Sequence, residues 1–330
     1  MRYVPIYEIN DRMILARHIK DDNDRVLLTS GQRISHKMIP RLKNFGIYYV
    51  CIEDKWSDDI QIDNVVTDVT KSKSINAIEK LDLDKIFECA STIVDEMAKS
   101  SDLVNDMTLI KEYDLTTYEH SLNVAINAVT VAMGLGMSYT RMNNIAVGAM
   151  LHDIGKREIP IEIISKKGKL DDYEISLIRQ HPDIGYKILS KDILIPASIK
   201  EVVHQHHENW DGTGYPRGLK HNEIYELASI VHICDVYDAL LSKRSYKDAF
   251  SYTDTISILK EQSGKQLSPY YVKAFFRLVP IYHRGVEVRL SNNSKALVIH
   301  NNHGDMLNPV VRLSNNKEID LRQSSLTIIS

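Results

Sequence analysis

The chain of 330 residues has few of the features that mark secreted, membrane-spanning or nucleic-acid-binding proteins. Its three cysteines, Cys51, Cys89 and Cys234, lie far apart and form no CxxC pair, so a disulfide framework is disfavoured and a reducing compartment is indicated. No apolar run approaches the roughly 18 residues of a membrane span. The first residues, "MRYVPIYEINDRM", lack the basic and then apolar pattern of a secretory signal. We therefore expect a cytoplasmic protein without a membrane partner.

An excess of positive charge is also missing. The chain has 41 Lys and Arg against 44 Asp and Glu, which gives a net charge of -3. This balance argues against general binding of DNA or RNA, although a small anionic ligand needs only a local basic pocket. Apolar residues make up 43% of the chain and charged residues 26%, as in globular proteins. The length predicts two or three domains.

The pattern along the chain predicts three segments and a mainly α fold. Residues 1–70 mix short strand-like pieces with turns, which indicates a small α/β accessory domain followed by a linker, with a regulatory or a structural role left open. Residues 71–282 show helical periodicity and are expected to form a helical bundle. Residues 283–330 alternate apolar and polar residues between Asn-rich turns, which is typical of a small antiparallel β appendage.

The segment "LHDIGK" predicts a metal ligand pair. His152 and Asp153 end an apolar helix that Gly155 is expected to close. Neighbouring side chains on a helix diverge by about 100°, so the two could straddle an ion beyond the helix end. Imidazole and carboxylate together suit Fe, Mn or Zn. The pair alone is weak evidence, because such a dipeptide also arises by chance.

A carboxylate within an apolar helix strengthens this interpretation. Asp235 stands inside "ASIVHICDVYDALL", where an unpaired charge would cost several kcal/mol and needs a cation, a proton or a metal. An ion pair or a partly exposed helix face is the alternative explanation.

Further histidines are expected at helix ends. His120 falls in the first turn of the helix in "TTYEHSLNVAINAVTVAMGLG", and His181 is expected to end another helix just before Pro182. His206 and His207 end a third. Spacings of about 25–32 residues correspond to one helix and one loop each, which is how bundles assemble metal centres from facing helices. In contrast, His204 and His232 are expected to be surface or satisfied core residues.

Five segments in this order resemble the HD-GYP family of metal-dependent phosphohydrolases. They are "HSLNVA", "LHDIGK", "LDDYEISLIRQHPDIG", "HHENWDGTGYP" and "CDVYDALLSKRSYK", and they span roughly residues 85–280. The resemblance implies an HD-type helical bundle that hydrolyses cyclic di-GMP to pGpG, and in some members to GMP. It also implies a centre of two or three divalent metal ions, often iron or manganese.

The resemblance assigns roles to individual residues. Asp153 would bridge two ions, Lys156 would contact the scissile phosphate, and both are expected to be catalytic. The implied metal ligands are His120, His152, Asp153, His181, His206, His207 and Asp235. The implied substrate contacts are Lys156, Tyr215, Pro216, Arg244 and Lys247. The assignment of His207 leaves a weak third ion or a substrate phosphate as alternatives.

One departure from the family pattern affects the number of ions. Members with a third metal have a Glu one turn before the first histidine, where this chain has Thr116. The neighbouring Glu119 points elsewhere on a helix. We therefore expect two ions that share a hydroxide, which attacks phosphorus in line.

Two alternatives to a cyclic di-GMP phosphodiesterase stay open from the sequence. The first is an HD hydrolase of another cyclic dinucleotide, such as cyclic GMP-AMP. The second is an inactive signalling module that binds a nucleotide. The expected partner is a small cyclic dinucleotide, and a second copy of the chain or a signalling protein is left open as a further partner.

Overall fold

The computed structural model describes residues 1–20, 25–44, 47, 49–60, 65–100, 102–103, 117–166, 168–241 and 250–329. The described residues form two compact units. One unit contains parts of Met1–Val65, Ser101–Leu115 and Pro280–Ser330, and the other contains parts of Val66–Ser100 and Thr116–Val279. The second unit is helical, so the prediction of a mainly α fold with small sheets near both ends of the chain is confirmed.

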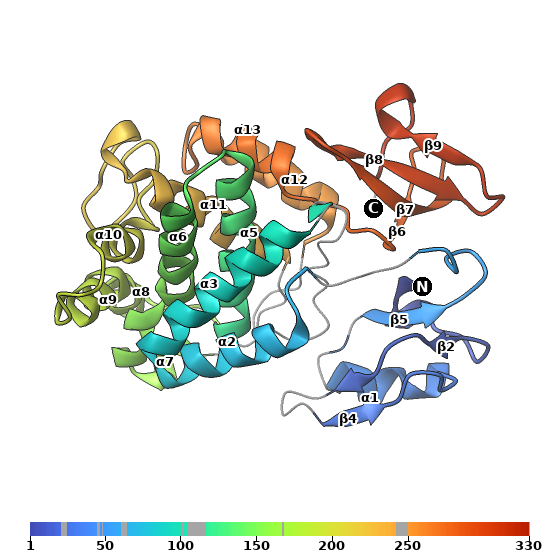
Figure 1. The fold of residues 1–330 in the computed structure, drawn as a ribbon, viewed down its shortest axis with the longest axis horizontal. Coiled ribbons are helices and arrows are strands. Elements are labelled where there is room, and N and C mark those ends of the chain that lie inside the picture. Colours follow the sequence, from blue (N-terminus) through green and yellow to red (C-terminus); the bar gives the residue numbers. More distant parts are fainter. Residues whose placement is uncertain are drawn as a thin grey trace. The chain divides into compact units, whose positions relative to one another are not determined.

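The helical unit contains the elements that carry the sequence motifs (Figure 1). They are α2 (Asp68–Lys80), α3 (Leu83–Lys99), α5 (Thr117–Gly134), α6 (Tyr139–Leu151), α7 (Ile161–Ile164), α8 (Asp172–Ile178), α9 (His181–Ser190), α10 (Ala197–Gln205), α11 (Glu226–Leu241), α12 (Tyr252–Gln262) and α13 (Pro269–Leu278). None of the helices in the described ranges is long and apolar enough to cross a lipid bilayer.

Helix α5 lies at the centre of this unit. It packs against α6 and α11, while α10 packs against α6 and α9. The apolar residues Leu122, Ile126 and Val129 on α5 are buried, as their helical spacing predicts. A helix buried on most of its sides has fixed neighbours, so side chains at its first turn have defined positions.

Two helix ends differ from the sequence prediction. Helix α6 ends at Leu151, and the chain continues into a 3-10 helix at Ile154–Glu158, so Gly155 does not close α6. Pro182 does not end a helix but lies in the first turn of α9, where its missing N–H is not needed. His181 therefore begins α9 rather than ending α8.

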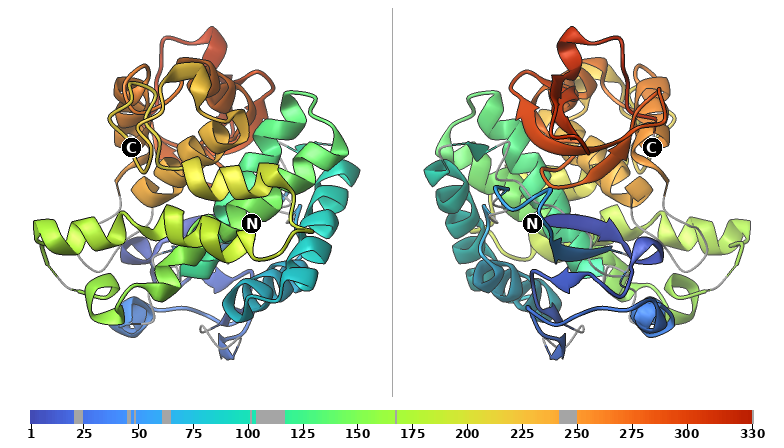
Figure 2. Two further views of the ribbon diagram at one scale, coloured as in Figure 1. Left: turned by 90° about the vertical axis from the view of Figure 1, so that its left-hand side faces the viewer. Right: turned by 90° about the vertical axis from the view of Figure 1, so that its right-hand side faces the viewer.

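The other unit contains two main sheets. Near the N-terminus, β1 (Arg2–Pro5), β5 (Tyr49–Glu53) and β2 (Ile14–Leu15) form an antiparallel sheet, with a hairpin of β3 (Ile19–Lys20) and β4 (Val26–Leu28) and a short α1 (Ile39–Asn44). The C-terminal strands, red in Figure 2, form a four-stranded antiparallel sheet, as predicted. They are β6 (Glu287–Arg289), β7 (Lys295–Asn302), β8 (Asp305–Leu313) and β9 (Glu318–Asp320).

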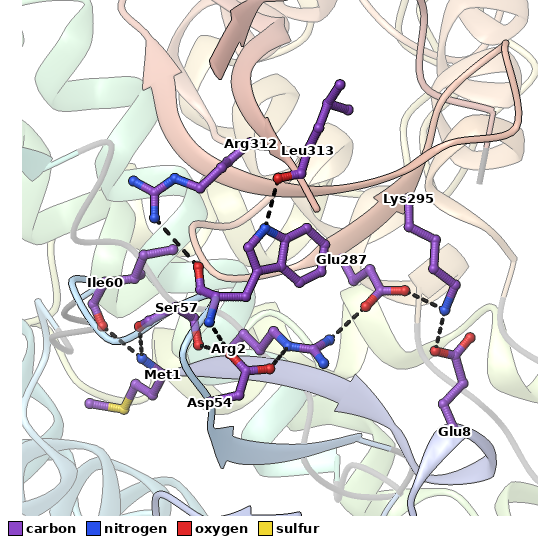
Figure 3. A network of polar contacts seen from close by, with 11 residues as sticks. Met1, Arg2, Glu8, Asp54, Ser57, Ile60, Glu287, Lys295, Arg312 and Leu313 are labelled. Atoms are coloured by element: carbon purple, nitrogen blue, oxygen red, sulfur yellow. Dashed lines mark hydrogen bonds and ion pairs between the residues drawn. The ribbon is translucent and has the colours of Figure 1, made fainter. Parts of the chain in front are cut away.

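The N-terminal and C-terminal segments are joined within this unit by polar contacts (Figure 3). Arg2 Nη1 lies 2.6 Å from Glu287 Oε2, and Lys295 Nζ lies 2.7 Å from Glu8 Oε2. Trp56 Nε1 donates to the carbonyl of Leu313 over 3.0 Å. The segments that the sequence separates as residues 1–70 and 283–330 thus contribute to one compact unit, while the role of residues 1–70 stays a prediction.

Candidate metal centre

Three buried histidines of the helical unit each carry an unprotonated nitrogen in the same region. In His152, His181 and His206, the Nδ1 atom lies 2.7–2.8 Å from the backbone carbonyl three residues earlier. A carbonyl accepts only, so each Nδ1 is the N–H donor and each Nε2 of the neutral ring has a free lone pair. All three side chains are fully buried. Local hydrogen bonds therefore set the tautomer that binds a metal.

The positions of these nitrogens fit a cation between them. His181 Nε2 lies 3.1 Å from His206 Nε2, although both atoms are acceptors in this tautomer. His152 Nε2 and Asp153 Oδ1 are buried and have no hydrogen-bond partner within the described residues. Buried polar groups are normally paired, so a set of acceptors without donors indicates a site for a metal ion.

The ligand-type side chains fall into two groups. In each group, the nitrogen and oxygen atoms lie within 4.8 Å of one another. The first group contains His120, His152 and Asp235, and the second contains Asp153, His181, His206 and His207. Asp153 lies close to both groups, because its Oδ2 is 3.4 Å from His152 Nε2 and its Oδ1 is 3.4 Å from His181 Nε2. The structure thus brings together all seven predicted ligands, each of which could bind an ion.

Close packing of backbone brings Asp153 to α9. A Cβ atom on Gly155 would lie 2.0 Å from the carbonyl oxygen of His181, so only glycine permits this approach. Lys156, in the same 3-10 turn, places its Nζ 2.6 Å from Asp153 Oδ2. Burial alone would raise the pKa of Asp153, but nearby positive charge, that of Lys156 above all, outweighs burial and holds this pKa well below its ordinary value.

His120 has a different environment from the other histidines. Its Nε2 lies 3.0 Å from Asp235 Oδ1, and its Nδ1 lies 2.6 Å from Asp238 Oδ2. Burial by itself lowers the pKa of His120, but the hydrogen bonds to the two carboxylates outweigh it and raise the pKa to about 9. Binding of a metal at Nε2 would release the proton from that nitrogen.

In the second group, burial lowers the pKa of the histidines. It lowers the pKa of His181 to about 4, and it lowers the pKa of His206 and His207 well below the ordinary value. These rings are therefore neutral at pH 7, the form in which imidazole binds metals. His207 is only half-buried, which makes it the most exposed member of its group.

The turn with the sequence GYP, residues 214–216, lies beside His207. The ring of Tyr215 stacks on His207 with a centroid distance of 4.8 Å and an angle of 25° between the planes. Tyr215 N donates to the carbonyl of His207 over 3.1 Å, and a Cβ on Gly214 would lie 2.5 Å from that oxygen. The glycine thus allows the turn to fold back on His207, which places the Tyr215–Pro216 step next to the second group.

Some predicted residues lie elsewhere or outside the described ranges. His204 pairs with Asp183 at 2.8 Å, and His232 is buried with its Nδ1 3.0 Å from the carbonyl of Glu208, so both have partners outside the two groups. Thr116, Arg244 and Lys247 are outside the residues that the structure describes.

Two residues near the centre were not found by the sequence analysis. Asp238 contacts Nδ1 of His120, and its spacing of three residues from Asp235 on a helix was the signal available. The buried Glu208 accepts hydrogen bonds from the backbone N–H groups of Arg217 and Leu219 at 2.7 and 2.9 Å. No sequence pattern indicated that Glu208 would bind these two backbone groups.

Comparison with known proteins agrees with the geometry. A cyclic di-GMP phosphodiesterase of Pseudomonas aeruginosa is 34% identical over 68% of this chain and 55% of its own length. A cyclic di-GMP phosphodiesterase of Thermotoga maritima is 36% identical over 57% of this chain and 52% of its own. A 3'3'-cGAMP-specific phosphodiesterase of Vibrio cholerae is 35% identical over 57% of this chain and 36% of its own. The chain thus spans about half the length of the first two relatives.

A solved structure shows the fold, and a family model shows the family. The structure of an HDG"Y"P protein from Bdellovibrio bacteriovorus matches with a TM-score of 0.55 at 16% identity, covering 83% of this chain and 97% of the other, which shows a shared fold. The model of the HD domain matches residues 103–269, just over half of the 330 residues. The chain therefore belongs to the HD domain family.

Proposed function

We propose that this protein is a metal-dependent phosphodiesterase that hydrolyses cyclic di-GMP to pGpG. The observation that carries the proposal is the pair of facing, unprotonated nitrogens of His181 and His206 beside the buried carboxylate of Asp153. The relatives named as cyclic di-GMP phosphodiesterases support the choice of substrate.

The two groups correspond to two ion sites. His120, His152 and Asp235 would hold one ion, and His181, His206 and His207 the other, with Asp153 between them. The imidazole and carboxylate donors are compatible with iron or manganese, the metals that the family resemblance implies. When bound, such ions activate water and stabilise charge on a phosphate.

The chain's own residues bind and orient the substrate around this centre. Lys156, whose Nζ lies 2.6 Å from Asp153 Oδ2, would contact the non-bridging oxygens of the scissile phosphate. Burial raises the pKa of Tyr215, so its hydroxyl keeps its proton and can donate a hydrogen bond. We place Arg244 and Lys247 among the substrate contacts on the sequence resemblance alone.

Replacement of the central carboxylate tests the proposal. We expect Asp153→Ala to lose metal and to lose hydrolysis of cyclic di-GMP, because this residue contacts both groups. Metal content is measured together with product formation by chromatography on anaerobically purified protein. Asp172→Ala, an exposed carboxylate on α8, is the control and keeps both. Full activity of Asp153→Ala would contradict the proposal, and metal binding without turnover in the unmodified protein would indicate an inactive module.

A second substrate is favoured by one comparison. The Vibrio cholerae relative named as specific for 3'3'-cGAMP is 35% identical to this chain. Parallel assays with cyclic di-GMP and cyclic GMP-AMP decide between the two, through the ratio of their kcat/KM values. Either substrate would place the protein in the cytoplasm, and a second copy or a signalling protein stays a predicted partner.

A further inference from the structure

Arg179 is a cation without a carboxylate partner in the described part of the chain. It follows α8 and is exposed to solvent. Two other cations of the same region are paired, since Lys156 contacts Asp153 and Lys166 contacts Glu174, both at 2.6 Å. An exposed arginine near the candidate metal centre, with no carboxylate partner among the described residues, is available for a ligand.

An aromatic ring holds this guanidinium near the metal centre. The Cζ atom of Arg179 lies over the ring of Tyr215, 5.4 Å from its centroid. Tyr215 in turn stacks on His207, a member of the second ligand group. The cation–π contact limits the positions of a long side chain that would otherwise sample many rotamers. Arg179 is therefore linked to the second ligand group through contacts of the Tyr215 ring.

The backbone of Arg179 is also fixed relative to the centre. Its N–H donates to the carbonyl of Ile175 over 2.9 Å, and α9 begins two residues later with the buried ring of His181. His207, the half-buried member of its group, stacks on the ring of Tyr215. A ligand that reaches the ions past His207 would thus meet Tyr215 and Arg179.

We propose that Arg179 binds the phosphate of a cyclic dinucleotide that is not being cleaved. This inference rests on the proposed function, in which the scissile phosphate lies at the ions beside Lys156. A cyclic dinucleotide has a second phosphodiester, and a guanidinium binds its two free oxygens through parallel hydrogen bonds. Tyr215 keeps the guanidinium in place before the substrate arrives, so less conformational entropy is lost on binding.

Substitution of Arg179 tests this role with two substrates. We expect Arg179→Gln in the metal-loaded full chain to raise KM for cyclic di-GMP roughly 10- to 100-fold with little change in kcat, since charge-assisted hydrogen bonds are lost. Bis(p-nitrophenyl) phosphate has a single phosphodiester, so its kcat/KM should stay unchanged. Arg179→Lys, which keeps the charge but not the paired donors, should give an intermediate KM.

A matched control and the salt dependence separate binding from folding. Arg277→Gln replaces another exposed arginine, on α13, and should leave both substrates and the melting temperature unchanged. The melting temperature of Arg179→Gln should equal that of the unmodified chain. The fall of kcat/KM for cyclic di-GMP with added salt should be weaker in Arg179→Gln, because one charged contact is missing.

The outcomes distinguish this inference from the proposed function. An unchanged KM in Arg179→Gln, or an equal loss for both substrates, overturns the role of Arg179. If the unmodified chain does not hydrolyse cyclic di-GMP, the proposed function fails, and equilibrium binding of the same dinucleotide decides the inference. Weaker binding by Arg179→Gln than by Arg277→Gln then supports it, and no binding by the unmodified chain overturns both.

Discussion

At the scale of single residues, the histidines of the centre are oriented in two ways. His152, His181 and His206 use the carbonyl three residues earlier, a contact within one turn of chain. His120 instead uses Asp238, a carboxylate on another helix. A carboxylate behind a ligating histidine raises the basicity of the ring and fixes its orientation.

We expect Asp238→Asn to weaken metal binding by about 10- to 100-fold, the usual result of removing such a partner. The neutral amide accepts a weaker hydrogen bond from His120 Nδ1 and no longer favours a proton there. Competition with a chelator of known affinity measures the change, and Asp172→Asn on the surface of α8 provides the comparison. Unaltered affinity in Asp238→Asn would show that Asp238 does not act through His120.

At the scale of elements, the turn after α10 is held from several directions. The carboxylate of Glu208 accepts from Arg217 N and Leu219 N, inside the turn that carries Tyr215. Trp210 N donates to the carbonyl of Gln266 over 3.0 Å, which ties the turn to the connection between α12 and α13. Tyr215 is therefore placed by contacts within the chain itself.

Glu208→Gln should loosen this turn, because one of its two acceptor oxygens becomes a donor that faces a backbone N–H. A buried unsatisfied group costs about 1–3 kcal/mol, so the amides of Arg217 and Leu219 should exchange with solvent at least several times faster. Hydrogen exchange followed by mass spectrometry of peptides 212–220 gives the rates. Glu261→Gln, an exposed carboxylate on α12, should leave them unaltered; equal rates in both variants would rule out this function of Glu208.

At the scale of the whole molecule, the two units should respond differently to metal. The candidate ligands all belong to the helical unit, and the chain's two tryptophans, Trp56 and Trp210, report on one unit each. At a free metal concentration of about 100 times Kd, binding stabilises the folded state by about 2.7 kcal/mol.

Chelation should therefore lower the melting temperature of the helical unit by about 5–10 °C, given about 2–4 °C per kcal/mol for a unit of this size. Fluorescence of Trp56→Phe follows the helical unit, and that of Trp210→Phe follows the other unit, whose transition should not move. Equal shifts of both transitions, or none in Trp56→Phe, would argue against a metal site built from these residues.

The amino-acid sequence determined the helices and most of the centre, because helical periodicity and the histidine-aspartate motifs are local patterns. Buried Leu122, Ile126 and Val129 repeat at helical spacing, and the seven predicted ligands come together in the structure. Pro182 was misplaced because proline is compatible both with the end of one helix and with the first turn of the next.

Only the tertiary structure decided which distant side chains face these local groups. Asp238 meets His120 across 118 positions of sequence, and Arg179 meets the ring of Tyr215. Arg2 pairs with Glu287 across 285 positions, so segments near the two ends of the chain share one unit. Such contacts depend on how helices and strands pack in three dimensions, and spacing along a single chain carries no record of that packing.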